Sequence, residues 1–399
     1  MQHLRVAVVG GGTGGLAAGL LLARDGHAVD VFERVADPLP VGAGILLQPL
    51  GQRVLAEVGL ADDLAACSTP VHRVEGRTTA GRPVLLFAYS DSPRGQVGLG
   101  VHRGDLFNLL WHSLRESGVA VRTATEIASV NETAAGWLVV GSDGDAAGPF
   151  DLVVAADGSR SRIRRQLGLA RKDVGYPYGV IWSVVPDPDG SLDGTLGQVY
   201  RDTRTTLGLL PTGAGMATVY WAIPNRNIAA TVAAGPAAFV DRVLPIAGPY
   251  RELVERVATA GILPSRYRDV VVRTPVVTRP RSGIVLIGDA AHAMSPQLGL
   301  GASLALADAW SLATALRIHR GDVRAALRAH ASARGDHVRW YTWLSRLLTP
   351  AFQSDLVPMG WARDLVFGPA QRVPWVRRQF VEIMLGEQTS PWTSWHPPG

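Results

Sequence analysis

The stretch that decides the fold is Leu4-Arg-Val-Ala-Val-Val9 followed by Gly10-Gly11-Gly12-Thr13-Gly14-Gly15. The first six residues are mostly apolar and β-branched, a pattern typical of a buried parallel strand. Helix-favouring residues follow at Leu16–Arg24, and Ala28–Phe32 is a second strand of the same kind. The sequence therefore predicts a strand–helix–strand unit that begins almost at residue 1.

The glycines of this turn have the G-x-G-x-x-G spacing of a dinucleotide-binding site. A pyrophosphate needs bare backbone that it can approach closely and a helix N-terminus directed at its charge. Glu33, at the end of the second strand, is placed to accept hydrogen bonds from the ribose hydroxyls of an adenosine. We assign to a dinucleotide Gly10, Gly12, Thr13, Gly14, Gly15, Glu33 and Arg34.

Two more buried strands are expected later in the chain, at Asp151–Ala156 and Gly283–Ile287. The first leads into Asp157-Gly158. The second leads into Gly288-Asp289 and then into a long apolar helix at about 302–318. Between them, strand-like segments alternate with Pro, Gly and Asp turns, which predicts an inserted antiparallel sheet. Its expected strands are 179–185, 195–201, 206–210 and 216–223, with 84–88 as a further strand.

The composition limits the classes of protein to consider. The 399 residues are 47% hydrophobic and 18% charged, a globular balance, and the single cysteine, Cys67, excludes an internal disulfide. The net charge is +5, but the arginines are scattered and form no nucleic-acid-binding run. No stretch approaches the roughly 18 apolar residues of a spanning helix. We expect a cytoplasmic protein with no metal, no nucleic-acid partner and no membrane span.

Two segments identify a family when they are taken with the glycine turn. Ala155-Ala-Asp-Gly-Ser-Arg-Ser-Arg-Ile-Arg164 and Gly288-Asp-Ala-Ala-His292 resemble, in order and spacing, the second and third motifs of the flavoprotein aromatic hydroxylases, the p-hydroxybenzoate hydroxylase-like family. Arg103 matches the arginine that precedes a helix in that family. The resemblance covers roughly residues 1–335 and implies a single-component, FAD-dependent monooxygenase.

The resemblance also implies the domain organisation. It is an α/β fold, with a Rossmann-like FAD-binding domain of residues 1–175 and 276–335 that is discontinuous in sequence. An inserted antiparallel β-sheet substrate domain occupies 176–275, with a contribution from about 71–100. A helical C-terminal cap occupies 336–399. Its tryptophans are expected to pack in the core or form a subunit contact rather than to close a flat pocket: Trp340, Trp343, Trp361 and Trp375.

Each matched position then has an implied role. Glu33 holds the adenosine ribose, Arg103 reaches the phosphate or ribityl region, and Asp289 bonds the ribityl chain. Asp157 lies where the nicotinamide and flavin cofactors pass, and Arg164 supports the helix that follows it. The isoalloxazine is lined by Pro296, Gly299, Leu300 and Gly301. Reduced flavin is anionic on its pyrimidine edge, which suits the N-terminus of the helix after Gly301.

The implied reaction uses NAD(P)H to reduce FAD and O2 to form a flavin hydroperoxide. One oxygen atom then hydroxylates or epoxidises an aromatic or heteroaromatic small molecule. The candidate catalytic residues are Pro296, His292 and Tyr220, with Tyr200 as a further option. For His292, capping or bracing a loop is the stronger interpretation. The tyrosines are also ordinary residues of a sheet, which favours aromatics.

Four positions differ from the family pattern. Pro49-Leu50 stands where Pro-Asn is usual, Leu300 where glutamine is common, and Ser303 where asparagine is common. Ser183 occupies a position that is often arginine. These differences surround the substrate region, so no relative's substrate is transferred to this chain.

Three other functions stay open at this point. Trp221-Ala-Ile-Pro224 resembles the second half of a flavin-dependent halogenase signature, but Val219 replaces its first tryptophan. Halogenases also need a lysine near the flavin, and the single lysine, Lys172, comes after the helix that follows Asp157. A flavoprotein reductase or oxidase acting on a prenyl-type substrate is the second. A flavin-binding protein that shelters an intermediate with little turnover is the third.

Overall fold

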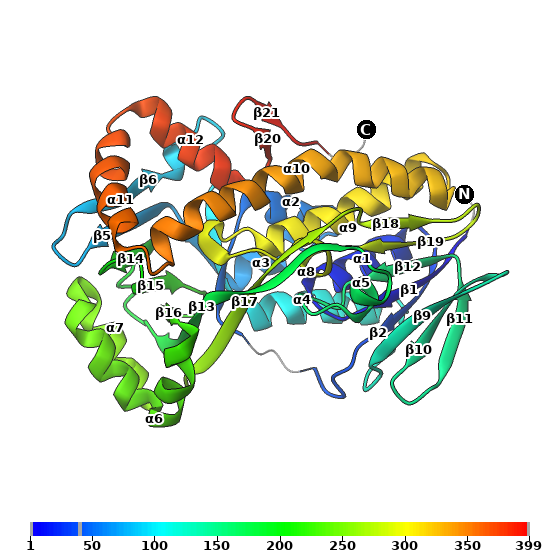
Figure 1. Cartoon of the computed structure of the whole chain (residues 1–399), viewed down its shortest axis with the longest axis horizontal. Helices are drawn as coiled ribbons and strands as arrows, with labels where there is room; N and C mark the ends of the chain where they lie inside the picture. Colours follow the sequence, from blue (N-terminus) through cyan, green and yellow to red (C-terminus); the bar gives the residue numbers. More distant parts are fainter. Residues whose placement is uncertain (1–2, 39–41, 397–399) are drawn as a thin grey trace.

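The computed structural model describes residues 3–38 and 42–396 (Figure 1). Its first unit is a six-stranded sheet in the order β18-β19-β12-β1-β2-β8. The strands are β1 (Arg5–Val9), β2 (Ala28–Phe32), β8 (Ala120–Arg122), β12 (Leu152–Ala155), β18 (Val276–Thr278) and β19 (Gly283–Leu286). All neighbours are parallel except β18, which lies antiparallel to β19 at the edge. The four buried strands predicted from the sequence all lie in this sheet, and the α/β fold is confirmed.

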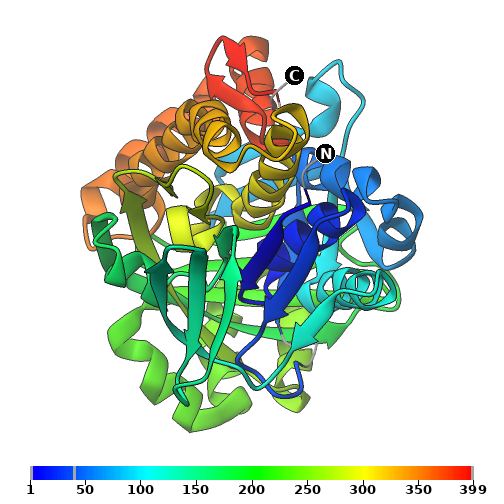
Figure 2. The same ribbon diagram turned by 90° about the vertical axis from the view of Figure 1, so that its right-hand side faces the viewer.

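Side chains of β1 alternate between the two faces of this sheet. Val6 and Val8 pack against helices, whereas Ala7 and Val9 pack against a second, three-stranded sheet. The ribbon of this second sheet is at the front of the molecule in Figure 2. The helices are α1 (Thr13–Arg24), α4 (Arg103–Glu116), α9 (Gly301–Ile318) and the start of α10 (Val323–Phe352). The second sheet contains β9 (Ile127–Thr133), β10 (Gly136–Gly141) and β11 (Ala146–Phe150). Both faces are covered, which explains why the central strands β1, β12 and β19 are largely apolar.

The inserted sheet has seven strands in the order β17-β13-β16-β15-β14-β5-β6. They are β5 (Arg73–Thr78), β6 (Pro83–Ala88), β13 (Ala170–Pro186), β14 (Thr195–Tyr200), β15 (Thr206–Pro211), β16 (Met216–Pro224) and β17 (Leu263–Val272). Pairing is antiparallel except between β14 and β5. β13 runs without a break across the predicted domain boundary at 175/176, so the chain has no structural boundary at that point. The division into domains therefore stays a prediction.

The two faces of the seven-stranded sheet have different neighbours. Val219 and Trp221 point toward α6 (Asn225–Val243) and α7 (Arg251–Glu255), which cover one face. Thr218 points the other way, and its Oγ1 accepts a hydrogen bond of 2.7 Å from Gly44 N. Gly44 belongs to a small sheet of β3 (Gly44–Leu47), β7 (Gly98–His102) and β4 (Ser68–Val71), which contacts β15 of the seven-stranded sheet and packs into the core of the six-stranded unit. The even-numbered side chains of β16 therefore face the six-stranded unit.

One segment, Asn225–Ile246, is long and apolar enough to cross a membrane by length and composition. This segment contrasts with the expectation from the sequence that no stretch is apolar enough for a spanning helix. Its helix, α6, is interrupted at Gly235, where φ is +84°. Phe239 and Val243, after this break, pack in the core of the seven-stranded sheet. The segment therefore folds as two short pieces of helix that cover a sheet.

The C-terminal region is helical, as predicted, except for a terminal hairpin. After α10 come α11 (Val357–Ala370) and α12 (Pro374–Leu385), followed by β20 (Gln388–Ser390) and β21 (Thr393–Ser394). In Figure 1 these helices follow one edge of the molecule and pass both large sheets. The remaining helices are α2 (Pro49–Glu57), α3 (Ala61–Ala66), α5 (Arg162–Gln166) and α8 (Asp289–His292).

Candidate active site

The three sequence motifs meet at one edge of the six-stranded sheet. Ala156 N donates to Val9 O at 2.8 Å, and Ile287 N donates to Ala155 O at 3.1 Å. The strands β1, β12 and β19 are therefore adjacent and parallel up to their carboxyl ends. Ligands of open α/β sheets bind outside these ends. Residues about 280 positions apart in sequence thus form one candidate site.

The glycines of the first turn have two different roles. Gly10 has φ +106°, and a Cβ at Gly10 or Gly15 would overlap a backbone carbonyl oxygen, that of Ala156 or Gly10 respectively. Around Gly12, by contrast, a Cβ would have no described atom within 4 Å. Gly10 and Gly15 are therefore required for folding, whereas Gly12 leaves open backbone. Within the described residues no side chain caps α1, so its first N–H groups are available to an anion.

Glu33 lies against the same turn. Its carboxylate accepts hydrogen bonds from Gly11 N at 2.7 Å and from Val35 N at 2.9 Å. Arg34 beside it is exposed. Arg103, the first residue of α4, is also exposed, and no carboxylate in the described ranges pairs with its guanidinium group. Glu33 thus leaves carboxylate lone pairs for a ribose, and Arg103 has a free positive charge.

In the second motif, Asp157 and Arg164 differ in accessibility. Asp157 Oδ2 accepts a hydrogen bond of 2.8 Å from Arg162 N, whereas its Oδ1 is buried and has no hydrogen-bond donor among the described residues. Arg164 is fully buried. It donates to Ala290 O and Ser159 O, both at 2.8 Å, and pairs with Asp173 at 2.7 Å. Arg164 therefore joins the second motif to the third rather than contacting a ligand itself.

The third motif is fixed by contacts with the carboxylate of Asp308, a residue of α9. Asp308 Oδ2 accepts a hydrogen bond of 2.7 Å from Gly288 N, where φ is +56°, and lies 2.6 Å from His292 Nε2. His292 is only 5% exposed. This burial argues against the catalytic role predicted for His292 and favours its alternative role as a brace. Asp289, in contrast, is exposed at the start of α8.

Asp308 belongs to a buried network that was not predicted from the sequence. Arg334 donates to Asp308 Oδ1 at 2.7 Å and also contacts His337, whose Nε2 lies 2.7 Å from Gly386 O. Burial alone would raise the pKa of Asp308, but His292 and Arg334 lower it below its usual range. Burial and the adjacent Arg334 lower the pKa of His337 to about 2. The sequence contains one sign of this network, because Asp308 is the single carboxylate in the largely apolar helix α9.

The turn before α9 places backbone, not side chains, at the site. Pro296, Gly299 and Gly301 are exposed, and Gly299 has φ +60°. Leu300 is only 2% exposed and packs in the apolar core with Leu50. The assignment of Leu300 to the isoalloxazine lining stays a prediction, and the burial of its side chain limits that role to its backbone. Within the described chain no side chain caps α9, which leaves its N–H groups open to a partial negative charge.

The face of the seven-stranded sheet that carries Thr218 also carries a chain of three hydrogen-bonded polar side chains. Tyr200 Oη donates to Gln198 Oε1 at 2.5 Å, and Gln198 Nε2 donates to Tyr220 Oη at 2.6 Å. Trp182 lies directly opposite Tyr220 in the register of β13 and β16. Burial raises the pKa of Tyr220 to about 12. Tyr220 is therefore a phenol at neutral pH, suited to donate a hydrogen bond and unsuited to act as a base.

In the segment that resembles a halogenase signature, the side chain of Trp221 points to the opposite face. Trp221 packs edge-on against Phe239 at 5.6 Å in the helix-covered core. Lys172 pairs with Asp269. Ser183, the other unusual residue of this sheet, donates to Gly261 O at 2.8 Å on the same covered face. These contacts explain Trp221 and Ser183 as structural residues.

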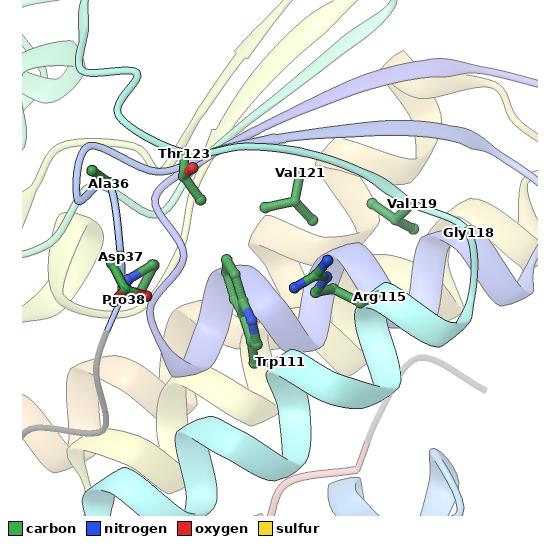
Figure 3. Close-up of a pocket in the computed structure, with 9 residues that line it drawn as sticks. All are labelled: Ala36, Asp37, Pro38, Trp111, Arg115, Gly118, Val119, Val121 and Thr123. Carbon is green, nitrogen blue, oxygen red and sulfur yellow. The ribbon is translucent and has the colours of Figure 1, made fainter.

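A groove of about 470 Å³ lies at the loop that follows Glu33 and Arg34 (Figure 3). Trp111 and Arg115 of α4 form one wall, and Asp37 with Pro38 of the loop after β2 forms the other. Val121 of β8 contributes to its lining. None of the predicted flavin residues lines this groove. The groove is therefore not part of the candidate flavin site.

These features together fit FAD. Open backbone at Gly12, uncapped N-termini of α1 and α9, and the partnerless Asp157 Oδ1 suit a ligand with a pyrophosphate and hydrogen-bond donors. The family model described as FAD binding domain matches residues 3–342. The chain belongs to this FAD-binding family. Its cofactor is FAD, as predicted.

Curated relatives and solved structures agree with this membership. The chain is 32% identical to 3-amino-4-hydroxybenzoate 2-monooxygenase of Streptomyces cremeus, over 84% of both chains. It is 29% identical to the FAD-dependent urate hydroxylase of Klebsiella pneumoniae, over 84% of this chain and 87% of that protein. The structure of Klebsiella pneumoniae HpxO complexed with FAD and uric acid is similar with a TM-score of 0.82 at 25% identity, covering 96% and 97%.

Proposed function

We propose that this chain is an FAD-dependent monooxygenase that uses NAD(P)H and O2 to hydroxylate or epoxidise a small aromatic or heteroaromatic molecule. The observation that carries the proposal is the meeting of three flavin motifs at the carboxyl ends of β1, β12 and β19. The relatives named above are monooxygenases or hydroxylases, which supports the same reaction class. Bound FAD supplies the acceptance of a hydride and the activation of O2.

The chain would hold FAD mainly through backbone and a few carboxylates. The turn at Gly10–Gly15 would take the pyrophosphate, and Glu33 the adenosine ribose. Asp289, exposed at the start of α8, would bond the ribityl chain. Arg103 would meet the phosphate or ribityl region with its unpaired charge. Pro296, with the backbone of 299–301, would face the isoalloxazine.

The part of this chain in the oxygenation itself is to position the substrate and exclude water. Tyr220 is suited to this because its high pKa keeps the hydroxyl protonated. We propose that Tyr220 donates a hydrogen bond to an oxygen or ring nitrogen of the substrate, with Gln198 holding its orientation. Trp182, opposite Tyr220 in register, offers a flat surface beside it.

The setting of the enzyme is also a proposal. A single cysteine suits a reducing cytoplasm, and the scattered arginines suit small anionic cofactors rather than nucleic acid. The break of α6 at Gly235 supports the absence of a membrane span. We therefore propose a cytoplasmic enzyme whose partners are an aromatic substrate, NAD(P)H and O2.

The test is oxygen-isotope incorporation by the purified, FAD-loaded protein. NADH and NADPH consumption is first screened against 3-amino-4-hydroxybenzoate and urate, the substrates named for two relatives, and against phenols, indoles, quinolones and polyketide aromatics. The best substrate is then turned over under ¹⁸O₂. We expect a product that contains one labelled oxygen atom. An unlabelled product, a chlorinated product in the presence of halide, or peroxide release without product would contradict the proposal.

A further inference from the structure

Helix α11 (Val357–Ala370) has its apolar residues on the outside. The exposed residues of this helix are all apolar: Pro358, Met359, Trp361, Ala362, Leu365, Val366 and Pro369. At 3.6 residues per turn these positions form a single face. A surface helix normally turns its charged side toward water, so α11 is reversed with respect to the usual pattern.

The buried side of α11 fixes this orientation. It contains Arg363, which donates to Ala351 O at 3.0 Å, pairs with Asp364 and lies 4.7 Å above the ring of Tyr200. Directly after the helix, Gln371 accepts a hydrogen bond from Leu86 N and donates to Val84 O, two backbone groups of the edge strand β6. The helix therefore cannot rotate its apolar face inward without breaking these contacts.

The exposed apolar face is large. Leu365 is 71% exposed and Trp361 is 66% exposed, and Leu356 continues the face just before the helix. A large apolar side chain has a surface on the order of 150 Å² or more, and several such side chains are more than half exposed here. Together they give roughly 600 Å² of exposed apolar surface. The largest apolar patch on a typical monomer is about 300–600 Å², so this face is at the upper end of that range. A stable interface of ordinary size takes about 800 Å² from each partner. The face therefore supplies most of what one half of a dimer interface needs.

We propose that α11 is the dimerisation helix of this protein, covered by α11 of a second copy across a two-fold axis. A two-fold interface brings the same surface of both copies together, so an apolar face needs no charge complement. Ala362 lies near the middle of the face and is its smallest residue, which allows the two helices to approach closely at the crossing point. In Figure 1, α11 lies at an outer edge of the molecule, where a second copy has access.

The charges beside the face favour a second copy over a lipid surface. Asp355, just before the helix, pairs with both Arg204 and Arg226, and Asp364 pairs with Arg363. These guanidinium groups are therefore not free to bind lipid phosphate. Helices that lie on anionic membranes carry lysine and arginine on their polar face. Paired charges around an apolar centre are instead typical of the rim of a protein interface.

The test compares molecular mass in solution for the full-length, FAD-loaded protein and two variants. By sedimentation velocity at micromolar concentration we expect wild type at twice the 42.4 kDa of one chain. Leu365→Glu should sediment as a single chain with its FAD content unchanged. The matched control is Ile318→Glu, at an exposed apolar position (44% exposed) at the end of α9, which should remain a dimer. A monomeric wild type, or a Leu365→Glu protein that remains dimeric, would overturn the proposal.

A second measurement locates the crossing point. Cys67 is the single cysteine, so a Cys67→Ser background allows one new thiol to be placed at will. In that background Ala362→Cys should form a covalent dimer with a short bismaleimide, whereas Ser332→Cys on the exposed side of α10 should not. Absence of the Ala362→Cys dimer would refute this geometry. Wild type that floats with phosphatidylserine vesicles as a monomer would identify a lipid surface as the occupant instead.

Discussion

Arg334 of α10 donates a hydrogen bond of 2.7 Å to Asp308 of α9, and both side chains are buried. The other carboxylate oxygen of Asp308 accepts a hydrogen bond from Gly288 N and lies within hydrogen-bond distance of His292 Nε2. The C-terminal region is therefore connected to the turn that precedes Asp289. The aromatic ring of Trp395 stacks on His337 at 5.0 Å and lies under Arg334 at 4.9 Å, which extends this connection to the end of the described chain.

Asp308→Asn should lower both stability and flavin affinity. The substitution leaves the buried Arg334 charge without its counter-ion, and breaking a buried pair in this way costs about 3–5 kcal/mol. Chemical unfolding measures the free energy, and fluorescence titration measures FAD binding. Asp322→Asn, at the exposed cap of α10, is the control and should cost no more than about 1 kcal/mol. Wild-type FAD affinity in a folded Asp308→Asn protein would show that the network does not position the flavin motif.

Acid should destabilise the protein between about pH 6.5 and 4. Burial lowers the pKa of His330 to about 4, whereas in the unfolded chain it is near 6.5. Below pH 6.5, His330 binds a proton in the unfolded state but not in the folded state. The contribution of His330 to the free energy of unfolding is therefore complete above pH 6.5 and decreases by about 3 kcal/mol as the pH falls to about 4. Urea unfolding at several pH values measures the slope. His337, whose pKa is lowered to about 2, contributes to the same slope, so His330→Gln should reduce the slope to about half. An unchanged slope would exclude His330 as a contributor.

Two glycine substitutions should separate ligand binding from folding. Gly12→Val should leave a folded protein that fails to retain FAD, because the space around Gly12 is open to the pyrophosphate. Gly15→Val should not fold, since its side chain would collide with Gly10 O. Circular dichroism reports folding, and absorbance of the flavin reports retention. A Gly12→Val protein that purifies with stoichiometric FAD would place the pyrophosphate elsewhere.

Glu33→Ala should weaken FAD binding by about 1–3 kcal/mol, the scale of lost charge-assisted hydrogen bonds. The variant also frees Gly11 N and Val35 N, so part of this loss comes from a looser turn. Glu33→Gln keeps one oxygen acceptor and should lie between Ala and wild type. Isothermal titration of the apoprotein gives the three affinities. Equal affinities for all three proteins would remove Glu33 from the site.

Tyr220→Phe should lower kcat/KM for the best substrate by roughly 10- to 100-fold, the effect of losing one hydrogen bond to the bound molecule. FAD content and stability should change little because the ring remains. Tyr200→Phe removes the distal hydroxyl of the same chain and is the control, with a smaller effect expected. Since the pKa of Tyr220 is about 12, its ionisation should not appear in the pH profile below pH 10. A Tyr220→Phe enzyme with unchanged kcat/KM would exclude this contact.

The sequence by itself determined the family, the cofactor and the parallel sheet. Gly10, Glu33 and the motif at Gly288 were identifiable because a strand, a glycine turn and a helix are adjacent in sequence, and local backbone requirements restrict which residues fit there. The strands predicted around them match those observed. Such features depend on neighbouring residues, so no tertiary information was needed to find them.

Only the tertiary structure decided what His292, Leu300 and Arg164 contact. His292 lies against Asp308, 16 positions away, and the side chain of Leu300 packs in an apolar core. The seven-stranded sheet likewise decided that Tyr220 faces the six-stranded unit while Trp221 faces α6. A shift of one residue in register exchanges these faces, and pairing between strands distant in sequence sets that register. The physical reason is that burial and side-chain direction depend on partners that sequence neighbours do not specify.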